Sequence, residues 1–150
     1  MGRSCWAVLA MLVALPPAAG AQGGDPVRAQ VERELARGQC SLAAWDVAWR
    51  GTLPGEARPV TVVTYTYENC GGRNNWGKSV GVYARDGASV RELPLPDRAG
   101  LPEAIQRVSV SKGRLLVEGL AYGPKDPHCC PSLKRRKAFV ARDGRLQAVR

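Results

Sequence analysis

The chain has 150 residues and a formal net charge of +9. This length fits one domain with a substantial hydrophobic core, so it argues against a multidomain assembly and against a small fold that depends wholly on disulfides. The positive charge either favours anionic partners, such as lipid headgroups, acidic polysaccharide, nucleic acid or acidic protein, or simply keeps the protein soluble.

Residues 1–21 have the pattern of a secretory signal peptide. Arg3 gives a positive start, residues 5–14 form an apolar run, and small residues in the A-x-A spacing end at Ala21. The apolar run is too short to span a bilayer, so no transmembrane segment is expected. We therefore expect cleavage after Ala21, one mature domain over residues 22–150, and a periplasmic or secreted location.

The mature part begins with a predicted helix over residues 26–37. Asp25 can cap its N-terminus, a proline suits its first position, and Gly38 supplies a stop. Three apolar side chains recur at steps of four and form one stripe: Val27, Val31 and Leu35. Because so short a helix is marginal alone, it must pack on the rest of the domain.

From Trp45 onward the sequence predicts strands. Residues 60–70 are rich in β-branched and aromatic side chains, as in a strand buried on at least one face. Three hairpins follow, with predicted turns at Asp86-Gly87, Lys112-Gly113 and Asp143-Gly144. We expect an α+β fold in which the helix packs on a mainly antiparallel β-sheet or small barrel of six to eight strands.

Four cysteines remain after cleavage, and an exported chain favours two disulfides among Cys40, Cys70, Cys129 and Cys130. Three pairings are open. A bond between the two adjacent cysteines strains the peptide between them, so the sequence favours Cys40 and Cys70 each bonded to one of the pair, in either order. The segment "DPHCCPS", residues 126–132, would then be a rigid clasp, with each bond contributing roughly 2–4 kcal/mol.

Other chemistries of this segment are less favoured. Zinc ligands are usually separated by two or more residues, whereas His128, Cys129 and Cys130 are contiguous. A reactive thiol pair is typically C-x-x-C at a helix start, and in extended chain His128 points away from Cys129. We therefore expect no catalytic residue, metal or cofactor, with a thiol oxidoreductase or hydrolase of the envelope as the alternative.

The densest charge run is "KRRK", residues 134–137. On a strand its side chains alternate between faces, which indicates an exposed edge or strand end, either protecting that edge or binding anions. Trp76 lies in a predicted loop over residues 71–78 as a candidate contact aromatic, although a loop tryptophan more often packs on the core. No RNA-binding motif is present, so no specific nucleic acid is expected. The candidate anion-binding residues are Arg73, Lys78, Lys125, Lys134, Arg135, Arg136 and Lys137.

One segment also resembles a family. The spacing Y-x-x-x-D-x-x-C-C-P-S is formed by Tyr122, Asp126, Cys129, Cys130, Pro131 and Ser132. It resembles the hallmark of bacterial exported proteins related to the mycobacterial LppP/LprE lipoproteins, over roughly residues 61–149. The resemblance implies a small, exported, β-rich protein and transfers no activity; this chain lacks the lipidation cysteine. We expect an exported non-enzymatic domain that binds an anionic envelope component or an acidic protein, and set no expectation for its oligomeric state.

Overall fold

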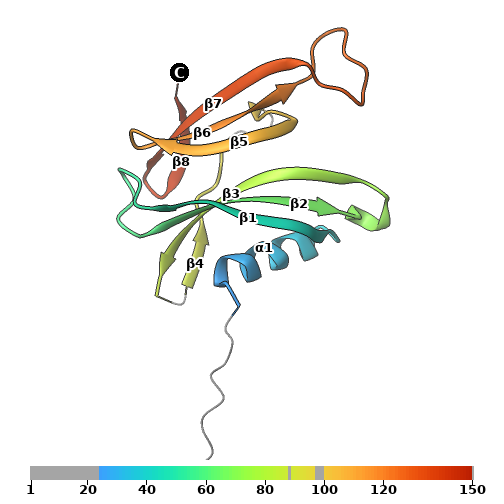
Figure 1. Cartoon of the computed structure of the whole chain (residues 1–150). Helices are drawn as coiled ribbons and strands as arrows, with labels where there is room; N and C mark the ends of the chain where they lie inside the picture. The colour runs from blue at the N-terminus through green and yellow to red at the C-terminus, as the bar shows by residue number, and fades with distance from the viewer. Residues whose placement is uncertain (1–23, 88, 97–99, 150) are drawn as a thin grey trace, which may run out of the picture.

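A computed structural model describes residues 24–87, 89–96 and 100–149. The expected signal peptide lies outside these residues. The described part forms one helix, a short 3-10 turn and eight strands (Figure 1). Their bounds are α1 Pro26–Arg37, β1 Ser41–Gly51, β2 Val60–Glu68, η1 Cys70–Gly72, β3 Trp76–Asp86, β4 Ser89–Glu92, β5 Ala104–Ser111, β6 Arg114–Ala121, β7 Leu133–Arg142 and β8 Arg145–Val149. Over the same ranges, the helix is neither long nor apolar enough to cross a membrane.

The strands form two separate four-stranded antiparallel sheets, with orders β1-β2-β3-β4 and β5-β6-β7-β8. The expectation of one sheet or a barrel is therefore wrong, although the strand number and the antiparallel pairing are right. The physical reason lies in the connection between β4 and β5, where Pro94 and Pro102 have no N–H to donate to a continuing ladder. We call β1–β4 the first sheet and β5–β8 the second sheet.

The main core fills the space between the two sheets. The first sheet contributes Val62, Val80 and Val82, and the second contributes Val117 and Phe139, all fully or almost fully buried. Side chains on alternate positions of a strand point to opposite faces, so this burial fixes which face of each sheet points inward.

Helix α1 has the bounds that were predicted from the sequence. It covers the outer face of the first sheet (Figure 1). The Asp25 side chain accepts a hydrogen bond from the Val27 amide at 2.9 Å, as a cap does. A second buried cluster joins the helix stripe to the sheet, and its buried members are Val27, Val31, Val63, Tyr65 and Tyr83. The Tyr83 hydroxyl donates to Glu34 of the helix at 2.9 Å, which satisfies a polar group under that layer.

The three predicted hairpins are present. The β5–β6 turn at Lys112-Gly113 and the β7–β8 turn at Asp143-Gly144 both have positive φ at their two central residues. This is the geometry of a two-residue turn whose twist matches the strands, and glycine adopts it without steric cost. The β3–β4 hairpin turns between Asp86 and Ser89.

The disulfide pairing differs from the expected one. Cys40 is bonded to Cys70, and Cys129 is bonded to Cys130. Antiparallel pairing of β1 with β2 places the residues just outside that pair together, so Cys40 meets Cys70 at a Cα–Cα distance of 4.0 Å. Cys129 and Cys130 belong to the β6–β7 loop of the second sheet, across the main core from α1, so the expected clasp does not form (Figure 1).

Candidate functional site

The outer face of the second sheet is rich in cations and has no described helix over it. Leu115, Val117 and Phe139 point into the core, so the side chains that alternate with them along each strand lie on this outer face. Six basic positions occupy this outer face, against one acidic position, Glu118. The basic positions are Arg107, Arg114, Lys134, Arg136, Arg142 and Arg145.

A depression lies on this part of the second sheet. Leu116, Ala138 and Val149 are register neighbours on β6, β7 and β8, so they form an apolar row across three strands. Cationic side chains surround this row. The depression has a volume of about 870 Å³ and is lined by Ser111, Lys112, Arg114, Leu116, Arg136, Lys137, Ala138 and Val149. An apolar floor with cations around it is suited to a ligand that carries several negative charges on an apolar or sugar scaffold.

The basic run on β7 is divided between the two faces of the sheet. Lys134 and Arg136 are on the outer face, where Arg136 lies 3.5 Å from Glu118 of β6. Arg135 is on the other face, 3.9 Å from Glu103. Pairing of β7 with β8 begins only at Ala138, so among the described residues nothing pairs with residues 134–137 on that side. The expectation that this run lies at an exposed edge is confirmed.

Two of the predicted anion-binding residues lie elsewhere. Arg73 lies in the loop between η1 and β3, and Lys78 lies on β3 of the first sheet. Trp76 is the first residue of β3, so the loop predicted over residues 71–78 ends before it, and the indole is 76% exposed. Arg73, Trp76 and Lys78 are neighbours in the sequence, and none of them lies on the outer face of the second sheet, which carries most of the cations.

The β6–β7 loop, residues 122–132, carries Lys125 and is organised around the carboxylate of Asp126. That carboxylate accepts hydrogen bonds of 2.7 Å from the Gly123 amide, the Ser132 amide and the Ser132 hydroxyl. The Gly123 amide and then the two Ser132 groups hold the pKa of Asp126 below its usual value, because they stabilise the charged form. The Tyr122 hydroxyl donates to the carbonyl oxygen of His128. Hydrogen bonds thus give this loop the shape that the predicted clasp was expected to impose.

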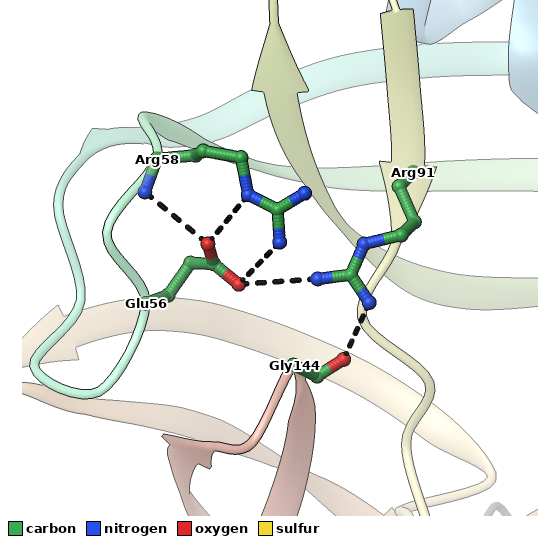
Figure 2. Close-up of polar contacts among 4 residues, drawn as sticks. All are labelled: Glu56, Arg58, Arg91 and Gly144. Carbon is green, nitrogen blue, oxygen red and sulfur yellow. Dashed lines mark hydrogen bonds and ion pairs between the residues drawn. The ribbon is translucent and has the colours of Figure 1, made fainter.

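Sequence reasoning missed a buried charge cluster between the sheets, shown in Figure 2. Glu56, in the connection between β1 and β2, has a side chain only 4% exposed. Its carboxylate accepts from the Arg58 amide at 3.2 Å, from Arg58 Nε at 2.8 Å and Nη2 at 3.0 Å, and from Arg91 Nη2 at 3.3 Å. Arg91, on β4, also donates from Nη1 to the carbonyl oxygen of Gly144 at 3.0 Å, which ties the first sheet to the β7–β8 turn.

The charges of this cluster stabilise the folded structure. Hydrogen bonding from Arg58, with the positive charges of Arg58 and Arg91, keeps the pKa of Glu56 below its ordinary value despite burial. A carboxylate held ionised in this way is a poor proton donor at neutral pH. The E-x-R spacing in the proline-bounded segment 53–59 was the only sequence signal, and nothing local indicated that Arg91 would join it.

Within the described ranges, no group of three or more histidine, cysteine, aspartate or glutamate side chains gathers closely enough to hold a metal ion. In comparisons with known proteins, no family model, no curated protein and no solved structure shows significant similarity to this chain.

Proposed function

We propose that this protein is an exported, non-enzymatic binding module that holds an anionic component of the cell envelope on the outer face of the second sheet. The observation that carries the proposal is the depression around Leu116, Ala138 and Val149, with cationic side chains beside the apolar row. The first sheet has a helix on its outer face, whereas the described part of the second sheet presents this face without one.

The geometry favours a ligand with repeated charges. Neighbouring strands are about 4.8 Å apart, and successive side chains on one face of a strand are about 6.8 Å apart. Cations at these spacings match phosphates or carboxylates carried by adjacent units of a polymer or by packed lipid headgroups. Two of the cations that line the depression are arginines, Arg114 and Arg136, and a guanidinium group binds a phosphate or carboxylate through two parallel hydrogen bonds.

The existing ion pairs leave this charge available. The Arg136–Glu118 pair is exposed on both sides and its atoms are 3.5 Å apart, so a ligand anion competes with a weak partner. The signal-like sequence of residues 1–21 and two disulfides both support export into an oxidising compartment.

The test compares two double variants that remove the same charge. Arg114→Gln with Arg136→Gln removes two cations from the depression, and Arg73→Gln with Lys78→Gln removes two from the first sheet. Binding is measured to vesicles with and without anionic lipid and to a soluble acidic polysaccharide, which separates the two sources of the same chemistry. Each lost cation weakens binding by about 1 kcal/mol, so the first pair should reduce affinity on the order of 30-fold.

The control pair should reduce affinity much less, because its residues do not line the depression. Equal losses in the two double variants would show that only net charge matters and would refute the site. Retention by an acidic protein, with no binding to vesicles or polysaccharide, would contradict the proposed class of ligand.

A further inference from the structure

The two disulfides of this chain differ in sequence separation, in exposure and in how much they restrict the unfolded chain. Cys40 and Cys70 are half-buried, 30 residues apart, and join the end of α1 to η1. Cys129 and Cys130 are adjacent in the chain, and both are exposed in the β6–β7 loop. A bond between neighbours closes a ring with a single peptide unit, so it restricts almost none of the unfolded chain. The Cys129–Cys130 bond therefore contributes little to the stability of the fold.

The β6–β7 loop keeps its shape through atoms other than sulfur. Asp126 accepts three hydrogen bonds in this loop, the Cys130 amide donates to the Pro127 carbonyl oxygen, and the Tyr122 hydroxyl donates to the carbonyl oxygen of His128. None of these contacts uses a sulfur atom. Opening the disulfide would leave the donors and acceptors of the loop in place, which is what a reversible redox pair requires.

Access to the sulfur atoms is also different. Thiol–disulfide exchange begins when a thiolate attacks along the S–S axis, so the sulfur must be reachable by another molecule. Cys129 and Cys130 are both exposed in the β6–β7 loop, which provides that access, whereas Cys40 and Cys70 are half-buried beside the end of α1 and the end of β2. The bond that contributes least to the fold is thus the one that a partner can reach.

We propose that Cys129 and Cys130 form a reversible disulfide–dithiol pair that accepts two electrons from a protein dithiol. A thiolate of the partner attacks one of the two sulfur atoms, an intermolecular disulfide forms, and the other cysteine leaves as a thiolate that takes up the proton lost by the partner. The second thiol of the partner, as its thiolate, then attacks the partner's own sulfur in the intermolecular bond, and the cysteine of this chain leaves as a thiolate that takes up the second proton. The partner ends with a disulfide, and this chain ends with two thiols at Cys129 and Cys130.

This activity is independent of anion binding. It uses the β6–β7 loop, while the proposed anion site uses the depression around Leu116 and Ala138. Loss of one function therefore leaves the other measurable in the same protein.

The first experiment sets the full chain in graded glutathione redox buffers, traps free thiols by alkylation, and assigns them by mass spectrometry. We expect Cys129 and Cys130 to be half-reduced at a [GSH]²/[GSSG] value at least about tenfold below that needed for Cys40 and Cys70. Circular dichroism and tryptophan fluorescence should not change across the first transition. Reduction of both pairs together, or of Cys40–Cys70 first, would overturn the proposal.

The second experiment measures electron transfer to a named probe, a reduced synthetic peptide containing C-x-x-C. The protein should oxidise one peptide per chain, whereas Cys130→Ser, which leaves a single free thiol at Cys129 and no disulfide to exchange, should oxidise none through this loop. The double variant Cys129→Ser with Cys130→Ser should oxidise none, while the matched variant Cys40→Ser with Cys70→Ser, where it folds, should retain the transfer. Undiminished oxidation by the Cys129/Cys130 double variant would assign the electrons to another site and refute the inference.

Discussion

Replacement of Glu56 by glutamine tests how strongly the buried charge cluster joins the two sheets. Glutamine keeps the size of the side chain and removes its charge, so the loss reports on the ion pairs and not on packing. In the wild-type protein the Glu56 side chain is 4% exposed, while Arg58 is 33% and Arg91 is 47% exposed. The carboxylate is thus almost fully removed from water, and the two guanidinium groups are not.

These exposures set the expected magnitude. Breaking a fully buried ion pair costs about 3–5 kcal/mol, because the remaining charge has no partner. Here both arginines recover water after the change, so the cost should approach that of a hydrogen bond to a charged group, about 1.5–3 kcal/mol. For a domain of this size that corresponds to a fall in Tm of about 6–12 °C.

Urea unfolding at pH 7, followed by tryptophan fluorescence to which Trp49 beside the main core contributes, measures this loss. The control is Glu118→Gln, which removes an exposed carboxylate oxygen that lies 3.5 Å from Arg136 Nε, and it should cost well under about 1 kcal/mol. Because the pKa of folded Glu56 lies below its ordinary value of 4.5, its contribution is complete above that pH and is lost as the pH falls through the lower, folded value. The difference between Glu56→Gln and wild type should therefore shrink as the pH falls below 4.5. A loss no larger than that of Glu118→Gln, or one that is the same at pH 3 and pH 7, would refute this account.

Three further changes have expected outcomes. Removing the Cys40–Cys70 bond by two serine substitutions should lower the free energy of unfolding by about 3–4 kcal/mol, since it closes a 30-residue loop; denaturant titration with and without reductant checks this. Gly119→Ala should cost about 1–3 kcal/mol, because a Cβ there would clash with the carbonyl oxygen of Ala104; a normal Tm would contradict that contact. Tyr83→Phe should cost about 1–2 kcal/mol by removing the hydrogen bond to the helix carboxylate, and an unchanged urea midpoint would show that this bond contributes nothing.

Local signals were enough to predict the helix and the hairpins. Helix α1 begins and ends where Asp25 and Gly38 indicate, because capping depends on residues within one turn of the end. The turns at Gly113 and Gly144 were predicted because positive φ is a property of the turn itself. These features need no knowledge of the rest of the fold.

Features that depend on how distant segments meet were not predictable. The division into two sheets could not be told from a barrel by the apolar pattern, because both arrangements bury the same apolar faces. The pairing of Cys40 with Cys70 follows from the register of β1 with β2, and the strain argument against Cys129–Cys130 led to the wrong pairing. The cluster at Glu56 requires β4 to approach the β1–β2 connection, which no local pattern reveals.

Only part of the candidate site could be read from the sequence. The run at residues 134–137 was correctly expected at an exposed edge, but Arg114 and Lys112 were not chosen, because they are far from it in the chain and meet it only through β6–β7 pairing. Arg73 and Lys78 were grouped with this run by charge alone, and they lie in the η1–β3 loop and on β3 of the first sheet.

The order of strands has a consequence for how the chain acquires its structure. In each sheet every strand pairs only with its immediate predecessor and successor, so each ladder can close as soon as its own residues are available. Short-range closure loses little chain entropy and is fast, and the slow event should be the meeting of two preformed halves across the proline-containing connector. Either sheet on its own would expose the valine, leucine and phenylalanine side chains that the other sheet covers in the folded protein. The chain is therefore most prone to self-association after the sheets form and before they pack together.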